Sequence, residues 1–325
     1  MRRRDSNLEP TGYESPRPHG LSGNQSRPSF TPARDFLATV QWLQYATLSH
    51  LRSGAPPHMT DHLGGTVIRT TIDSLTRGES PNPVTDVCDL TLLPIKDRPF
   101  PHVIHNRFID PVIYRQLCDS FPTCLSRTGP SRFSLYWGDD DYQRLLDEEP
   151  VWQRLFSMFH SQQFIDWTRE QFSPVWDELG YKIDLSDARY VPYREDRVDK
   201  EREVLREIKH APDELWVRME IHQARVGYHR NIHVDHRRRL LTMLIYFCDH
   251  EENRMHGGEL LLHNAPKQRW YRGRATRIAP RPNLMLAFPC SSRSFHSVAP
   301  ITAQAAPRNY LQVHISSSVD IWDQG

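Results

Sequence analysis

Apolar and polar residues alternate with a period of two in two segments of the last third of the chain. Residues 217–222 read VRMEIH and residues 310–315 read YLQVHI, so each segment places its apolar side chains on one face of a strand. Shorter apolar segments lie between them, at 240–247, 259–262 and 284–288, and glycine, proline and asparagine separate these segments. Several short strands with turn signals are typical of a sandwich, barrel or jelly roll. We therefore expect the C-terminal part of the domain to be mostly β.

The region upstream of these strands has helical character. Asp110 followed by Pro111 is an N-cap followed by proline at the first helical position, which predicts a helix that runs to Phe121. Residues 142–179 carry Trp, Phe and Leu at helical spacing and predict one or two amphipathic helices. Residues 99–104 (PFPHVI) predict a short strand before the first helix. The pattern favours an α+β fold with supporting helices packed on one face of the β core.

Composition divides the chain into three parts. They are residues 1–58, an N-terminal extension over 59–98, and a domain over 99–325 whose helical support spans 110–215 and whose β core spans 216–316. The first part is rich in Pro, Ser, Gly and Arg and has few periodic apolar positions, so we expect it to be disordered or not to be translated. In the second case Met59 is the expected translation start.

One segment of the support is dense in charge. Residues 194–214 hold 14 charged residues in 21, six basic and eight acidic. Mixed charge of this kind is typical of a solvated helix or a surface insertion, and a lid over a site is the alternative.

The global composition excludes several classes of protein. A formal net charge of +1 argues against a nucleic-acid binder, because it supplies no global field that would hold a polyanion. Apolar runs such as residues 243–248 fall far short of the roughly 20 residues that a membrane helix needs, so we expect no membrane span. The five cysteines are an odd number without a CxxC motif, which favours reduced thiols and a cytoplasmic protein.

A histidine and an aspartate follow the first alternating segment at a spacing of two. His233 and Asp235 lie on one side of the backbone if the chain stays extended there, because residues i and i+2 share a face. Together they can hold a divalent metal. The pair alone is a weak signal, since 17 His and 40 acidic residues in this length give about two such triplets by chance.

The residues that follow this pair make the signal specific. In order come RRLLTMLIYF over 238–247, the sequence GGEL from Gly257, FHSV over 295–298, and Arg308 beside the last long strand. This order resembles that of Fe(II)- and 2-oxoglutarate-dependent dioxygenases of the prolyl-4-hydroxylase-like branch, which have a double-stranded β-helix (jelly-roll) core. The resemblance covers residues 216–315, and the earlier segment PFPHVIHNRFIDPVIYRQLCDSFP resembles the strand and helix that precede this core in bacterial members.

The resemblance assigns roles position by position. It implies that His233, Asp235 and His296 bind iron, and two imidazoles with one carboxylate on one face leave three coordination positions open for 2-oxoglutarate and O2. Arg308 matches the basic position that binds the far carboxylate of 2-oxoglutarate, with nearby Arg293 as the alternative in another register. Tyr246 matches a tyrosine that hydrogen-bonds the same carboxylate. Thr242 lies on the same strand face and is expected to line the pocket.

The reaction that the resemblance implies is hydroxylation of a C–H bond in a protein, peptide or small-molecule substrate, with release of succinate and CO2. Ascorbate is a further candidate cofactor. The carboxylate of Asp235 favours hydroxylation, because related halogenases lack it. The alternatives are a non-catalytic metal-binding jelly roll and a cupin-like enzyme independent of 2-oxoglutarate. Substrate and oligomeric state stay open.

Several weaker candidates lie in the same region. Arg218, Glu220 and Tyr228 are candidates for substrate contact, whereas Gly257 and Gly258 are expected to form a turn rather than touch a ligand. Further metal-binding histidines and an anion-attracting role for the triplet Arg237, Arg238 and Arg239 are less favoured interpretations.

Overall fold

The computed structural model describes residues 87–123, 125–136, 138–192, 210–264 and 275–323, all within the unit Ser74–Gly325. The expectations for residues 1–58, for Met59 and for most of the segment 194–214 lie outside these ranges. Among the described residues, no helix combines the length and the hydropathy needed to cross a membrane.

The fold begins with a short strand and a capped helix. β1 (Val103–His105) leads into α3 (Pro111–Asp119), and the Asp110 carboxylate accepts hydrogen bonds from two backbone N–H groups of the first helical turn. This is the predicted N-cap, which satisfies donors that the helix itself leaves without partners. The helix ends slightly before Phe121, because Ser120 already leaves the helical conformation.

Residues 140–179 form three helices, whereas the sequence predicted one or two over residues 142–179. They are α4 (Asp140–Glu148), α5 (Pro150–Phe159) and α6 (Gln162–Leu179). The first break falls at Pro150, because proline disfavours the helical conformation of the residue before it. The second break falls at Ser161, whose hydroxyl caps α6 by accepting a hydrogen bond from the Phe164 N–H.

Two sheets form the β core. The remaining strands are β2 (Ser126–Gly129), β3 (Arg132–Leu135), β4 (Arg189–Tyr190), β5 (Glu214–Ala224), β6 (Arg230–His233), β7 (Arg239–Tyr246), β8 (Leu260–Leu262), β9 (Thr276–Ile278), β10 (Met285–Pro289), β11 (His296–Val298) and β12 (Arg308–Ser317). The larger sheet has the order β1-β10-β7-β12-β5-β3-β2, with β4 also pairing β5, and the smaller has the order β6-β11-β8-β9. Within each order the neighbours are antiparallel, and from β5 to β12 successive strands alternate between the sheets except for β8 and β9, which both lie in the smaller sheet. This is the double-stranded β-helix expected from the sequence.

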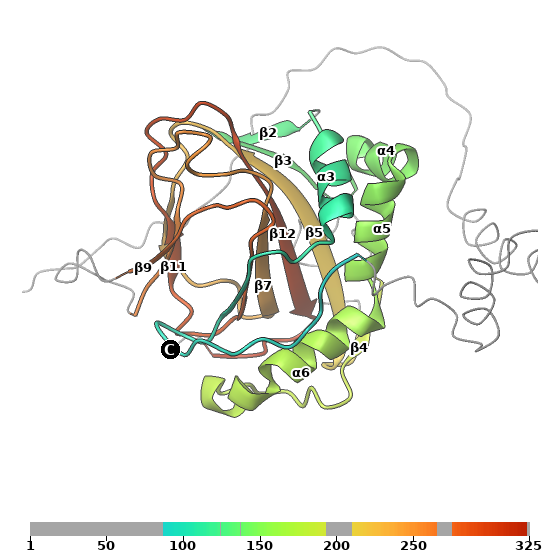
Figure 1. Cartoon of the computed structure of the whole chain (residues 1–325). Helices are drawn as coiled ribbons and strands as arrows, with labels where there is room; N and C mark the ends of the chain where they lie inside the picture. Colours follow the sequence, from blue (N-terminus) through green and yellow to red (C-terminus); the bar gives the residue numbers. More distant parts are fainter. Residues whose placement is uncertain (1–86, 124, 137, 193–209, 265–274, 324–325) are drawn as a thin grey trace, which may run out of the picture. The chain divides into compact units, whose positions relative to one another are not determined.

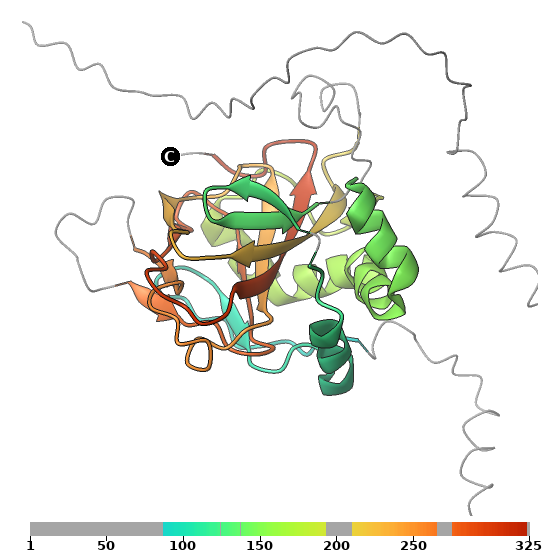
Figure 2. The same ribbon diagram turned by 90° about the horizontal axis from the view of Figure 1, so that it is seen from above.

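The alternating residues of β5 and β12 give the larger sheet two different faces. Val217, Met219 and Val313 are fully buried on its outer face, where the Tyr142 hydroxyl of α4 donates to the Met219 carbonyl at 2.9 Å. Figure 1 shows α3 to α6 on this side of β5 and β12, with β9 and β11 on the opposite side. Figure 2 gives the same arrangement from above. The helices therefore cover one face, as predicted, and the inner face is left to the polar residues of β5 and β12.

The support segment 110–215 is not all helical. β2 and β3 form a hairpin around Gly129 and Pro130, and β3 pairs with the free edge of β5. Pairing with a long strand stabilises a short hairpin that would be marginal alone, and four-residue strands of mixed polarity give no clear period in the sequence.

Candidate metal centre

Three predicted ligands meet at one end of the smaller sheet. His233 ends β6, Asp235 follows two residues later, and His296 begins β11, where it lies opposite His233 in the strand register. One ligand atom from each residue lies within 4.8 Å of the other two, and the imidazole centroids are 4.2 Å apart. Asp235 and His296 are buried, whereas His233 is half-buried. Two imidazoles and one carboxylate on a shared face are the donor set of non-haem Fe(II) oxygenases.

Backbone carbonyls orient both imidazoles. The Nδ1 of His233 is 2.8 Å from the Asn231 carbonyl, and the Nδ1 of His296 is 2.9 Å from the Ser294 carbonyl. Because a carbonyl can only accept, each Nδ1 carries the proton and each Nε2 is left with a lone pair for a metal. Burial, aided by neighbouring His296, lowers the pKa of His233 to about 4, so its ring is neutral at pH 7. The donor set therefore fits a divalent metal.

Both oxygens of the Asp235 carboxylate are held. Oδ1 accepts from Arg239 at 2.6 Å, and Oδ2 accepts from the Thr242 hydroxyl at 2.7 Å. Burial opposes ionisation of Asp235, but Arg239 outweighs it and, with nearby His296 and His314, holds the pKa well below its usual range. The carboxylate is thus charged and fixed, as a metal ligand should be.

Thr242 and His314 extend this network into the larger sheet. Since the Thr242 hydroxyl donates to Asp235, the contact of 3.2 Å between that hydroxyl and His314 Nδ1 requires the imidazole to donate. Burial is the main cause that lowers the pKa of His314 to about 3, which keeps the ring neutral. Thr242 therefore lies beside the predicted metal ligands.

Arg308 lies on the inner face of β12 with its guanidinium buried. Its Nε donates to the Gly258 carbonyl at 2.9 Å and its Nη2 donates to the Tyr246 hydroxyl at 3.2 Å. The rings of Tyr246 and Tyr310 flank the guanidinium, with centroids 5.0 and 4.4 Å from its carbon. Within the described part of the chain, no carboxylate forms an ion pair with Arg308. A buried cation without an anion is unfavourable alone and is suited to an anionic ligand.

The structure separates Arg308 from its alternative. The side chain of Arg293 is 65% exposed and pairs with Glu178 at 3.5 Å. Arg308 is only 1% exposed and contacts Tyr246. The inner face of the sheet therefore carries Arg308, whereas Arg293 lies outside the barrel.

Gly257 and Gly258 have a role that their turn signal does not reveal. Both have positive φ, of 81° and 82°, and a Cβ on Gly257 would come within 1.8 Å of the Pro300 carbonyl oxygen. The turn was predicted, but the Gly258 carbonyl also holds the Arg308 guanidinium. A backbone carbonyl has no residue-type signal, so the sequence could not indicate this contact.

The three arginines at 237–239 bind two different carboxylates. Arg237 and Arg238 pair with Asp320 at 2.8 and 3.6 Å, whereas Arg239 binds Asp235. The C-terminal segment reinforces the same loop, because the Ile321 N–H donates to the Arg237 carbonyl and the buried Trp322 indole donates to the Arg239 carbonyl at 3.1 Å. Sequence analysis missed the role of Arg239, whose only signal was its spacing of four from Asp235.

The weaker candidates also face the interior of the barrel. Arg218 and Glu220 form an ion pair of 2.6 Å on the inner face of β5, and the Tyr228 hydroxyl is 3.5 Å from that of Tyr310. No second group of three potential metal ligands occurs within the described ranges.

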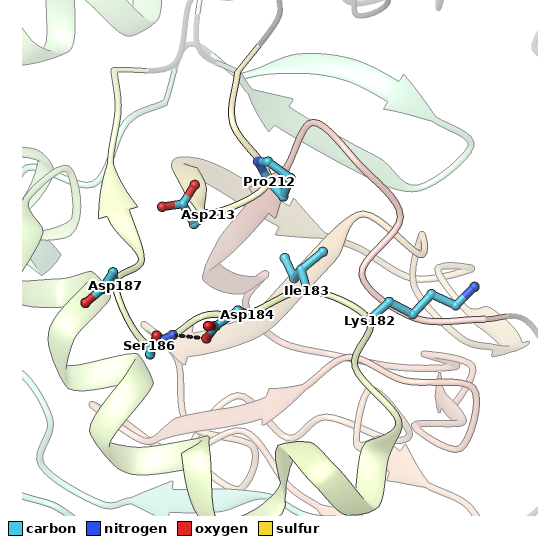
Figure 3. A pocket seen from close by; sticks show the side chains of 7 residues that line it. All are labelled: Lys182, Ile183, Asp184, Ser186, Asp187, Pro212 and Asp213. Atoms are coloured by element: carbon cyan, nitrogen blue, oxygen red, sulfur yellow. Dashed lines mark hydrogen bonds between the residues drawn. The ribbon is translucent and has the colours of Figure 1, made fainter.

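A separate pocket of about 400 Å³ lies beyond the core and contains none of the predicted site residues (Figure 3). Lys182, Asp184, Asp187 and Asp213 contribute to its lining, and the Ser186 N–H donates to Asp184 at 2.9 Å. Its carboxylates lack the imidazole partners found at the other site.

Comparison with known proteins agrees with this geometry. Residues 219–315 match the 2OG-Fe(II) oxygenase superfamily, and the match includes all six predicted site residues. No curated protein matches the chain. The match lies in the β core and supports the superfamily that the sequence predicts.

Three solved structures are similar to this chain. A prolyl 4-hydroxylase of Phytophthora capsici is 15% identical with a TM-score of 0.40, over 66% of this chain and 58% of that one. A prolyl hydroxylase of Trichoplax adhaerens, in complex with a hypoxia inducible factor peptide fragment, is 15% identical with a TM-score of 0.39, over 66% and 83%. A prolyl-4-hydroxylase of Pseudomonas putida is 11% identical with a TM-score of 0.35, over 66% and 92%. The chain therefore spans less than two thirds of the Phytophthora protein.

Proposed function

We propose that this protein is an Fe(II)- and 2-oxoglutarate-dependent dioxygenase that hydroxylates a C–H bond of a protein, peptide or small-molecule substrate. The observation that carries the proposal is the convergence of a two-histidine, one-carboxylate set with a buried guanidinium that has no described anionic partner. The two imidazoles and the carboxylate suit Fe(II), and the Arg308 guanidinium suits the far carboxylate of 2-oxoglutarate. When bound, these two groups supply O2 activation coupled to oxidative decarboxylation of 2-oxoglutarate to succinate and CO2.

The side chains of this protein bind and orient in this proposal. His233, Asp235 and His296 hold Fe(II), with the two Nε2 atoms presented by the carbonyls behind each ring. Arg308 binds the co-substrate carboxylate, and the Tyr246 hydroxyl, already bonded to that guanidinium, is placed to donate to the same carboxylate.

Thr242 and Arg239 act indirectly, by fixing the Asp235 carboxylate. Thr242 is thus a positioning residue in our proposal rather than a direct contact of 2-oxoglutarate. The protein supplies a fixed ligand set in a largely buried site, which is the usual contribution of a protein to cofactor chemistry.

We propose further that the protein belongs to the prolyl-4-hydroxylase-like branch, and its substrate stays a protein, a peptide or a small molecule. We also propose a cytoplasmic protein, a proposal that four described free cysteines support: Cys88, Cys118, Cys248 and Cys290. A cupin-like metal protein is disfavoured, because such a protein has no use for the buried cation at Arg308.

The test is anaerobic addition of Fe(II) and then 2-oxoglutarate to the purified protein, followed by visible absorption for the weak charge-transfer band. We expect a band that is absent from the His233→Ala variant and retained by Arg293→Gln, which changes an exposed arginine on β-core loops. Succinate release across a library of peptides and metabolites then identifies the substrate. Folded protein that binds Fe(II) without the band on 2-oxoglutarate addition would refute the dioxygenase and favour the cupin-like alternative.

A further inference from the structure

The strand that ends in His233 has one edge without a described partner. β6 stands last in the order of the smaller sheet and pairs only with β11, where His233 lies opposite His296. Among the described residues, no segment other than β11 forms a backbone hydrogen bond with residues 230–233. An edge of this kind presents backbone N–H and C=O groups that can pair with a further chain in extended conformation.

The larger sheet extends beyond this edge. Since β5 precedes β6, β11 precedes β12 and β7 precedes β8 along the chain, the order β7-β12-β5 lies across from the order β8-β11-β6. The larger sheet continues past β5 with β3 and β2, whereas the described part of the smaller sheet ends at β6. A strand added to β6 would therefore lie across from β3, in a second layer that the described chain does not fill.

The hairpin of β2 and β3, which would cover this added strand, is held in place. The Arg225 N–H donates to the Ser131 carbonyl at 2.9 Å, and a Cβ on Gly227 would lie 2.8 Å from the Ser131 hydroxyl. The connection from β5 to β6 thus packs directly against the hairpin turn. Within the hairpin, the hydroxyls of Thr128 and Ser134 are 2.9 Å apart and hydrogen-bonded. Walls that are fixed before a ligand arrives lower the entropic cost of binding.

The free edge of β6 also lies next to the open side of the metal site. Asp235 and His296 are buried, and His233 is the half-buried member of the three ligands, so the ligands are reached from the β6 side. Neighbouring strands are about 4.8 Å apart, and directly opposed residues have Cβ atoms about 5 Å apart on the same face. A residue of an added strand opposite His233 would thus present its side chain on the face that carries the metal ligands.

The chemistry of the edge favours a polypeptide as its occupant. An added peptide strand repeats donors and acceptors at the spacing of the strand it joins, which a small molecule does not. β6 contains no proline, and beside His233 its one basic residue is Arg230, so little in its sequence opposes pairing. The Asn231 carbonyl accepts from Nδ1 of His233 and keeps a second lone pair for a peptide N–H.

We propose that the free edge of β6 binds an extended segment of a polypeptide substrate by strand addition, and that the residue opposite His233 presents its side chain to the metal site. The inference rests on the proposed function and narrows the substrate classes left open there to a polypeptide. Backbone hydrogen bonds supply the affinity, and the side chains of alternate residues face the metal ligands.

Hydrogen exchange of the intact protein tests the docking surface. The probe is the tightest binder from a library of decapeptides with blocked ends, selected on the anaerobic protein with Fe(II) and 2-oxoglutarate, where no turnover occurs. We expect the bound peptide to slow the exchange of backbone amides in residues 230–233 by at least about tenfold. The amides of β9, the strand at the other end of the smaller sheet, are the internal control and should exchange as before.

N-methylation of the same peptide distinguishes strand addition from other modes of binding. Alternate N–H groups of an added strand point towards β6, and the intervening ones point away from it. Methylation within one alternate set should weaken binding by about tenfold or more at each position that bonds β6, because the donor is lost. Methylation of the intervening set is the matched control and should leave the affinity unchanged.

The outcomes separate this inference from the proposed function. Absence of any binding peptide, unchanged exchange in residues 230–233, or equal weakening by both sets of methyl groups overturns strand addition. Succinate release with a small molecule and with no peptide of the library also overturns it, while the dioxygenase stands. Absence of the 2-oxoglutarate charge-transfer band refutes the proposed function instead, and hydrogen exchange of the metal-free protein with the same library then still tests the β6 edge. All of these measurements use the wild-type protein, so none depends on the folding of a variant.

Discussion

Replacing Arg308 by methionine should abolish the stabilisation of the protein by 2-oxoglutarate while leaving the protein folded. Arg308 is 1% exposed, and the proposed ligand would supply the anion that this guanidinium lacks among the described residues. Methionine fills a similar volume without a charge. Loss of a bidentate charge-assisted contact costs about 3 kcal/mol, or more than a hundredfold in affinity.

The size of the effect follows from linkage. At a 2-oxoglutarate concentration of about 100 times the dissociation constant, the ligand stabilises the wild-type protein by about 2.7 kcal/mol, and a hundredfold weaker site reduces this to about 0.4 kcal/mol. For a domain of this size that corresponds to a rise in Tm of about 5–10 °C for the wild type and about 1–2 °C for Arg308→Met. The measurement is anaerobic thermal unfolding with Fe(II), with and without 2-oxoglutarate.

The comparison must be made within each variant. Methionine removes a buried charge, which favours the folded state, but it also leaves the Gly258 carbonyl without its donor, which costs about 1–3 kcal/mol. These changes affect the ligand-free protein and cancel when each variant serves as its own reference. Arg293→Met, which alters an exposed arginine, is the control and should keep the wild-type shift. An Arg308→Met variant that gains as much from 2-oxoglutarate as the wild type would show that Arg308 does not bind it.

Three further predictions test the surrounding structure. Gly257→Ala should cost more than about 3 kcal/mol in urea unfolding, because its Cβ would come within 1.8 Å of the Pro300 carbonyl oxygen at a φ of 81°. Arg239→Met should weaken Fe(II) binding by about 10- to 100-fold in a metal titration, because Asp235 loses the partner of one oxygen. The metal-free protein should lose stability as pH falls from about 6.5 towards 4, and His160→Asn should lose less, because burial lowers the pKa of His160 to about 4 and the unfolded chain therefore takes up the proton first.

Two of these predictions have a matched control variant, and the third has a defined refuting outcome. Gly180→Ala also alters a positive-φ glycine, but it meets no atom within 4 Å and should cost only about 1 kcal/mol. Arg144→Met, which breaks an arginine–aspartate pair on the surface of α4, should not change Fe(II) affinity. For His160 the asparagine keeps an N–H for the Phe156 carbonyl, and an unchanged pH dependence in that variant would assign the acid lability to other groups.

The sequence predicts those parts of the site that depend on side-chain type and strand period. The role of Arg308 was implied by the resemblance to the dioxygenase family, and the alternation of β12 agrees with its inward position. The spacing of two between His233 and Asp235 indicated that both lie on one side of the chain where β6 ends. The helix cap at Asp110 and the outward apolar face of the larger sheet follow from equally local rules.

The parts that the sequence does not predict depend on tertiary pairing. β9 and β11 contain three residues each, too few to show a period, and they exist because neighbouring strands supply their hydrogen bonds. The hydrogen bond from Arg308 to Gly258 ends on a backbone oxygen, which any residue possesses. Which arginine of the triplet reaches Asp235 depends on the path of the loop, because all three are chemically equivalent.

The contacts of Ile321 and Trp322 set a practical limit on how this protein can be trimmed. Trp322 and Ile321 hold the backbone of the loop that carries Asp235, although neither is near a ligand atom in sequence. A shortened version intended for crystallisation or for fusion at its C-terminal end should keep Trp322. Cutting before it would loosen the Asp235 carboxylate indirectly, and weak iron retention in such a preparation would then be an artefact of the boundary rather than a property of the full-length protein.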